Sequence, residues 1–166
     1  MSDIAGRSYH LRGSAREIGF ALGRALGEKL GQNIGRYIEK LPGSQGSLDT
    51  DKLRRGALPW LLSLPLRFQD ELEGMAEGVN IPLRRLAEWG FVEQCVQNGC
   101  SGLVGLFEGR AWVARNNDTF VPDMRGYMTI REVDNRIPTI SFGLEGDVFA
   151  PTGINREKLW LHLCAR

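Results

Sequence analysis

The sequence predicts a mixed α+β fold, in which a helical first part precedes a set of antiparallel strands. Three observations support this prediction. Apolar residues recur at every fourth position before residue 98, an Asn-Gly pair at 98–99 interrupts that pattern, and short apolar runs separated by turn residues follow it. We therefore divide the 166-residue chain into a helical segment of residues 1–99 and a β-rich segment of residues 100–166.

The first predicted helix begins at a capping box, in which Ser14 is the N-cap and Glu17 follows three residues later. Its apolar residues would form one ridge that extends to about Lys40: Ile18, Leu22, Leu26, Leu30, Ile34 and Ile38. A second row consists of glycines: Gly19, Gly23, Gly27, Gly31 and Gly35. Each of these glycines costs about 1 kcal/mol relative to alanine. We therefore expect the backbone of another element to pack closely against this row. The charged residues of the segment argue against a helix pair inside a membrane.

Proline and glycine positions predict the remaining helices. One is expected from about Asp51, with interruptions at Pro59 and Pro65. Another covers residues 69–77 and is expected to end at Gly78. The last begins near Pro82 and extends to about residue 96.

Alternating patterns in the second part predict strands at 101–107, 110–115, 127–133, 139–144 and 159–163. A two-residue turn at Glu108-Gly109 would pair positions whose numbers sum to 217. Cys100 then lies opposite Asn117, and Gly102 lies opposite Arg115. A slip of one residue would change which side chains share a face, so the neighbourhood is a firmer prediction than the exact pairing.

Composition and charge exclude several classes of function. The 21 Lys and Arg balance the 20 Asp and Glu, so neither nucleic acid nor a membrane surface is an expected partner. The chain has no apolar run of about 18 residues and no signal-like start, so we expect a cytoplasmic protein. The three cysteines and two histidines have no metal-ligand spacing. We therefore expect no disulfide framework, no metal and no cofactor.

The segment with the clearest chemistry contains Cys100 and the run from Arg115 to Asp118, which the predicted hairpin folds back onto the cysteine. A guanidinium beside a sulfur favours the thiolate, which is the reactive form. The alternative is an ordinary surface Arg–Asp pair beside a buried, inert cysteine. Geometry alone leaves both interpretations open.

The junction before Cys100 also has two interpretations. Asn98-Gly99 is a common tight-turn pair. Gly99 would also present an unhindered carbonyl to the thiol of Cys100, so that an N-to-S acyl shift followed by hydrolysis would release a chain that starts at Cys100. The new α-amine, with an ordinary pKa of about 7.7–8.0, suits a general base near neutral pH. One residue would then supply both nucleophile and base.

Three stretches together resemble the isopenicillin-N acyltransferase-like family (acyl-coenzyme A:6-aminopenicillanic acid acyltransferases) of N-terminal-nucleophile hydrolases, which are related to choloylglycine hydrolases. They are the Gly-x-x-x-Glu-x-Gly-x-x-x-Gly segment within residues 11–23, the Glu-Leu-x-Gly-x-Ala-x-Gly segment at 71–78, and Gly99-Cys100-Ser101 followed by Arg115-Asn116-Asn117-Asp118. Each stretch is weak evidence alone. Together they span most of the chain in the family's order.

The resemblance implies a self-processing enzyme precursor, or zymogen, that hydrolyses linear amides or transfers their acyl groups without a cofactor. Residues 1–99 would be the pro-segment, and residues 100–166 would begin the catalytic chain and supply the first antiparallel strands of an αββα sandwich. Cleavage between Gly99 and Cys100 would expose the nucleophile Cys100, with Asp118 orienting its α-amine and Arg115 steadying the sulfur. Gly153-Ile154-Asn155 resembles the family's oxyanion element, so Asn155 is a candidate donor. An ordinary turn residue is the equal alternative.

The chain departs from the family pattern in extent. Family members continue beyond the point that corresponds to Arg166, so we expect a sandwich that is incomplete at the C-terminus. Expected partners are a small-molecule amide or acyl-thioester substrate, and either a second copy or the missing C-terminal part. The alternative function is a non-catalytic helical and β module that acts through protein association. No pattern brings His10 or His162 to Cys100, so neither is an expected catalytic residue.

Overall fold

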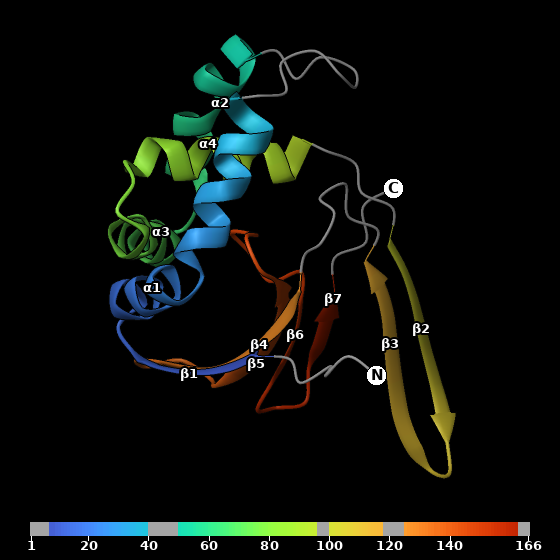
Figure 1. Cartoon of the computed structure of the whole chain (residues 1–166). Helices are drawn as coiled ribbons and strands as arrows, with labels where there is room; N and C mark the ends of the chain where they lie inside the picture. Colours follow the sequence, from blue (N-terminus) through green and yellow to red (C-terminus); the bar gives the residue numbers. More distant parts are fainter. Residues whose placement is uncertain (1–6, 40–49, 96–99, 118–124, 163–166) are drawn as a thin grey trace.

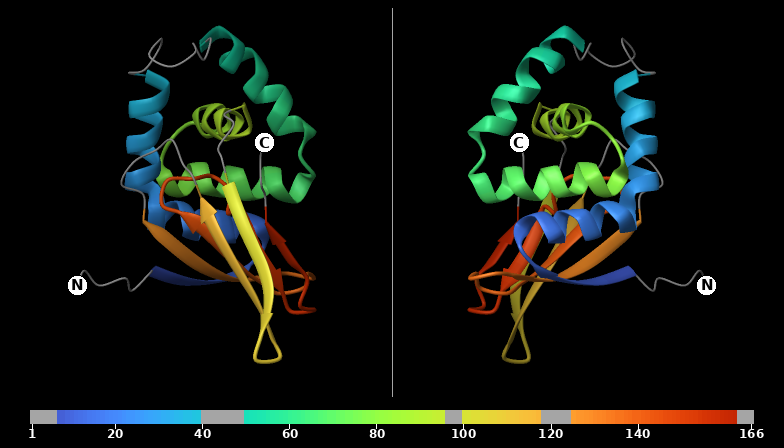
Figure 2. Two further views of the ribbon diagram at one scale, coloured as in Figure 1. Left: turned by 90° about the vertical axis from the view of Figure 1, so that its right-hand side faces the viewer. Right: turned by 90° about the vertical axis from the view of Figure 1, so that its left-hand side faces the viewer.

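The structure is a computed structural model that describes residues 7–39, 50–95, 100–117 and 125–162 (Figure 1). It has a mixed α+β fold, as predicted. A layer of helices covers one face of a five-stranded sheet, and a separate two-stranded hairpin extends beside the sheet (Figure 2). No helix in the described ranges has the length and apolar character that crossing a membrane requires.

The helical layer consists of α1 (Ala15–Asn33), a π-helix (Ile34–Glu39), α2 (Thr50–Ser63), α3 (Leu66–Val79) and α4 (Leu83–Cys95). The predicted capping box is confirmed. The Ser14 side chain accepts a hydrogen bond from the Glu17 backbone N–H, and the Ser14 N–H donates to Glu17 Oε2 at 2.8 Å. The first helix therefore begins where the sequence predicted, and only its last six residues change to π geometry.

Two predicted helix breaks are wrong. Pro59 lies inside α2 rather than interrupting it. Ala57 and Leu61, on either side of the proline, are both buried, so tertiary packing retains the helix. Gly78 does not end α3. The helix continues to Val79 and is capped by Asn80, whose φ of 63° is left-handed.

The predicted close backbone packing is present in the first part of the glycine row, where Gly19, Gly23 and Gly27 lie against the backbone of α3, but not at Gly31. A Cβ on Gly19 would lie 1.9 Å from the carbonyl oxygen of Glu71, and one on Gly23 would lie 2.4 Å from that of Met75. The contact is reciprocal, because Cβ atoms on Gly74 and Gly78 would meet the carbonyl oxygens of Arg16 and Phe20 at 2.0 and 2.3 Å. Gly78 therefore serves helix packing rather than helix termination.

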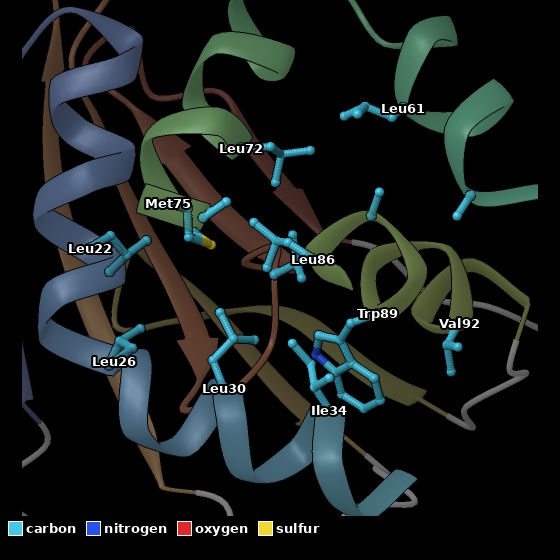
Figure 3. Close-up of a cluster of buried hydrophobic side chains, with 14 of the residues drawn as sticks. Leu22, Leu26, Leu30, Ile34, Leu61, Leu72, Met75, Leu86, Trp89 and Val92 are labelled. Carbon is cyan, nitrogen blue, oxygen red and sulfur yellow. The ribbon is translucent and has the colours of Figure 1, made fainter. Parts of the chain in front are cut away.

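The hydrophobic core lies within the helical layer and between that layer and the sheet. Figure 3 shows the ridge of α1 facing α3 and α4: Leu22, Leu26 and Leu30 approach Met75, Leu86 and Trp89. All six of these side chains are buried. An ion pair between Arg131 of the sheet and Glu71 of α3 joins the two layers where both side chains are largely shielded from solvent.

The five-stranded sheet has the order β1-β4-β5-β6-β7. β4 (Gly126–Val133), β5 (Thr139–Leu144), β6 (Thr152–Asn155) and β7 (Trp160–His162) form an antiparallel meander, and β1 (Arg7–Gly13) is parallel to β4. The sequence predicted β4, β5 and β7 but missed the other two. β1 has few apolar residues, and β6 is only four residues long, so neither has a clear alternating pattern.

The hairpin consists of β2 (Cys100–Phe107) and β3 (Arg110–Asn117). Its register is the predicted one, with Cys100 opposite Asn117 and Gly102 opposite Arg115. Glu108 and Gly109 have φ values of 49° and 71°, as a type I′ turn requires. Figure 1 shows the turn projecting away from the helices. Near it, large apolar side chains are exposed: Leu103, Val104, Leu106, Phe107 and Trp112.

The glycine packing predicts opposite effects for two alanine substitutions in α1. Gly23→Ala places a Cβ against the α3 backbone and should lower the free energy of unfolding by about 1–3 kcal/mol. Gly31→Ala is the matched control, because its Cβ would meet no described atom within 4 Å. It should raise that free energy by up to about 1 kcal/mol through helix propensity. Urea unfolding checks both values, and equal effects would contradict the close packing.

Candidate functional site

Cys100 is the first residue of β2, is half-buried, and is not in a disulfide. The Arg115 side chain from β3 reaches it across the hairpin, with Nη2 at 3.1 Å from Sγ. A guanidinium donating to sulfur at this distance stabilises a developing thiolate. The structure thus brings together two of the residues that the sequence singled out.

Arg115 also connects the hairpin to the five-stranded sheet. Its Nη1 donates to Oγ1 of Thr152, at 3.1 Å. Thr152 is buried at the start of β6, so the hydroxyl lies on a rigid element. The two nitrogens of one planar group therefore contact two different sheets, and this holds the guanidinium beside the sulfur.

His162 lies at the base of the hairpin, which the sequence analysis did not anticipate. A Cβ on Gly102 would lie 3.1 Å from both Cε1 and Nε2 of the imidazole, so the absent side chain allows the ring to approach β2. Trp160 Nε1 donates to His162 Nδ1 at 3.3 Å, which places the proton of the neutral ring on Nε2. A glycine inside a strand often marks such an approach, so Gly102 was the available signal.

Asp147 is a second residue that the sequence analysis missed. It lies in the segment between β5 and β6, where burial raises the pKa of its carboxyl from 3.8 to about 7, although the positive charge of Arg115 opposes the shift. The guanidinium that contacts Cys100 thus also acts on a buried acid. The signal in the sequence was an acidic residue directly before the apolar pair Val148-Phe149.

The segment that carries Asp147 is fixed by the helical layer. The carbonyl oxygen of Gly146 accepts hydrogen bonds from Trp89 Nε1 at 2.8 Å and from Asn33 Nδ2 at 3.3 Å. On the other side of Asp147, Val148 is buried in the core and Phe149 packs edge-on against Trp60 of α2. Asp147 is thus held between two anchored neighbours.

The other three residues that the sequence analysis assigned to the site are Gly99, Asp118 and Asn155. Gly99 and Asp118 lie outside the described residues, so the structure places neither the bond that we expect to be cleaved nor the carboxylate that we expect to orient the amine. Asn155 lies at the end of β6, and its Oδ1 accepts a hydrogen bond from the Leu159 N–H at 2.9 Å. It is three residues from Thr152, or about 10 Å along the strand. This contact is the one expected of an ordinary turn residue, which was the alternative interpretation of Asn155.

Among the described residues, no three His, Cys, Asp or Glu side chains form a group that could hold a metal ion. The sequence matches no protein-family model and no curated protein. The functional interpretation therefore depends on the motifs of the sequence and on the contacts around Arg115.

The raised pKa of Asp147 predicts a specific dependence of stability on pH. The folded state binds the proton more tightly than the unfolded state, so stability is lost as the pH rises from about 4 to about 7 and is then constant. Asp147→Asn removes this loss. The variant should therefore gain stability relative to wild type between pH 4 and pH 8, by no more than about 4 kcal/mol. Urea unfolding at both pH values measures the gain, and a difference between the proteins that is independent of pH would contradict it.

Proposed function

We propose that the chain is the self-processing precursor of a cysteine N-terminal-nucleophile enzyme, cleaved between Gly99 and Cys100, that hydrolyses linear amides or transfers their acyl groups. The observation that carries the proposal is the 3.1 Å contact between Arg115 Nη2 and Cys100 Sγ. It supports an activated sulfur at the position where the motifs require one. A buried, inert cysteine would not need a guanidinium beside it.

Processing begins when the Cys100 sulfur attacks the carbonyl carbon of Gly99. The peptide C–N bond breaks, its nitrogen takes the proton, and a thioester forms between Gly99 and the sulfur. Water then cleaves the thioester, which leaves a carboxylate on Gly99 and restores the thiol. The product chain starts at Cys100 and carries a new α-amine.

The same two groups of Cys100 then act on the substrate. The α-amine accepts the thiol proton, the thiolate attacks the amide carbonyl, and the amine product leaves with a proton. Water or an acceptor amine releases the acyl group from sulfur. In this scheme Asp118 orients the α-amine and Arg115 steadies the sulfur. An oxyanion role for Asn155 would use its Nδ2, because its Oδ1 accepts the Leu159 N–H.

Intact mass tests self-processing directly. Wild-type protein should separate into two fragments during incubation, the second beginning at Cys100, whereas Cys100→Ala should remain whole. Arg115→Met removes a charge-assisted contact and should slow cleavage about tenfold to hundredfold. Arg110→Met, an exposed change on the same strand, is the matched control and should cleave at the wild-type rate. A wild-type chain that behaves like Cys100→Ala would count against the proposal.

A second candidate function is association through the hairpin, as a non-catalytic module. The observation in its favour is the exposure of Leu106 (83%) and Leu103 (71%) near a turn that extends beyond the sheet. Exposed apolar groups on a short two-stranded ribbon favour contact with another chain.

Light scattering separates this alternative from the first proposal. If association is the function, wild-type protein should form a stable oligomer, and Leu106→Lys should convert it to a monomer by charging the apolar surface. Glu108→Gln, in the exposed turn, makes the same change of one positive unit of charge and is the matched control. A wild-type monomer would exclude association between copies of this chain.

A further inference from the structure

His162 of β7 lies beside the strand that carries the Cys100 sulfur, and the proposed mechanism assigns it no role. We propose that His162 Nε2 donates a hydrogen bond to the oxygen of a carbonyl group under attack by Cys100, and so stabilises the negative charge that develops there. This role in acylation of the thiol does not require self-processing. Its consequence for substrate turnover rests on the proposed function.

Strand alternation determines on which side of the hairpin the imidazole lies. Gly102 follows Cys100 by two residues in β2, so a Cβ on Gly102 would point to the same side as the Cys100 side chain. That Cβ position lies 3.1 Å from both Cε1 and Nε2 of His162. Arg115 is directly opposite Gly102 in β3 and belongs to the same face. The imidazole is therefore beside the face that holds both the sulfur and the guanidinium.

The five-stranded sheet places His162 near the sulfur independently of Gly102. Thr152 of β6 is paired directly with His162 of β7, so the two side chains share one face of the sheet. Thr152 Oγ1 accepts a hydrogen bond from Arg115 Nη1 at 3.1 Å, and Nη2 of this guanidinium is 3.1 Å from Cys100 Sγ. The Cα atoms of Cys100 and Gly102 are about 7 Å apart along β2. A carbonyl group attached to the sulfur would extend into this interval.

Trp160 determines which nitrogen of His162 carries the proton. The indole Nε1–H can only donate, and it lies 3.3 Å from Nδ1, so Nδ1 accepts and the proton of the neutral ring is on Nε2. The indole itself packs against the Phe142 ring, at 6.2 Å between centroids. Among the described residues, Nε2 has no hydrogen-bond partner. The result is a half-buried N–H donor of fixed tautomer that is available to a ligand on the hairpin face.

Asn155, the donor that the sequence suggested, is less well placed. It follows Thr152 by three residues in β6, so strand alternation directs its side chain to the opposite face of the sheet. Its Oδ1 also accepts the Leu159 N–H within the turn. His162 shares the face of Thr152, which is the face that Arg115 contacts. The contacts of the described residues therefore favour His162 over Asn155 as the donor.

The hydrogen bond would act on charge and would transfer no proton. The thiolate attacks the carbonyl carbon, the π electrons move to the oxygen, and the oxyanion accepts the hydrogen bond from His162 Nε2. The carbonyl double bond then forms again as the leaving group departs, and the imidazole keeps its proton throughout. A donor that is fixed before the reaction is effective because it does not have to reorganise as the charge develops.

Two reactions of the same sulfur separate this role from a structural one. Acylation of Cys100 by p-nitrophenyl acetate passes through an oxyanion, whereas alkylation by iodoacetamide does not. In His162→Phe, acylation should slow by about tenfold or more and alkylation should change by less than about twofold. His162→Gln can place an amide N–H near the position of Nε2 and should restore most of the acylation rate. Release of p-nitrophenolate by the full chain, corrected with Cys100→Ala, measures acylation, and peptide mass spectrometry measures alkylation.

His10→Phe is the matched control, because this other histidine contacts Glu132 of β4 and should leave both rates unchanged. If His162→Phe does not fold, His162→Asn tests the same point. Its amide reaches only the position of Nδ1, so acylation alone should slow. Equal changes in the two rates, or an unchanged acylation rate, would overturn the inference.

Intact mass of the same samples reports cleavage at Gly99 and keeps the two proposals separate. A selective loss of acylation in His162→Phe, together with wild-type chains that remain whole, would overturn the proposed function alone. Wild-type cleavage without a selective loss of acylation would overturn only this inference.

Discussion

The guanidinium of Arg115 interacts with the hairpin, with the five-stranded sheet and with the segment between β5 and β6. One nitrogen contacts Cys100 of the hairpin, another contacts Thr152 of the five-stranded sheet, and its charge acts on the buried acid Asp147. A planar group with several donors can make all of these interactions at once, whereas an ammonium group has no such geometry. This side chain therefore helps to fix the position of the sulfur relative to the sheet.

The helical layer determines what surrounds that side chain. Close contact between the glycines of α1 and α3 brings the two backbones together and fixes the ridge that packs on Trp89. The indole of Trp89, with Asn33 from α1, then holds the Gly146 carbonyl next to Asp147. The helix packing within residues 1–99 thereby influences the position of the buried acid Asp147 within residues 100–166.

Patterns among neighbouring residues predicted most of the helices and strands. They also placed Arg115 beside Cys100, but they did not indicate His162 or Asp147. The Ser14 capping box and the turn at Glu108-Gly109 depend on neighbouring residues only, and the turn was enough to place Arg115 beside Cys100. β1 and β6 were missed because their partners are distant in sequence and their own patterns are weak. Asp147 was missed for a related reason. Its raised pKa results from burial beneath the helical layer, and no pattern among neighbouring residues predicts that burial.

Catalysis and association place different demands on the hairpin. Association requires only that the apolar residues near the turn remain exposed, and it sets no condition on the opposite end. A catalytic sulfur requires that the base of the hairpin be positioned precisely against the sheet. The base meets this condition, because Gly102 lacks the side chain that would displace His162, and Arg115 connects Cys100 to Thr152. The proposed catalytic function would therefore account for these contacts at the base of the hairpin, whereas association alone would not.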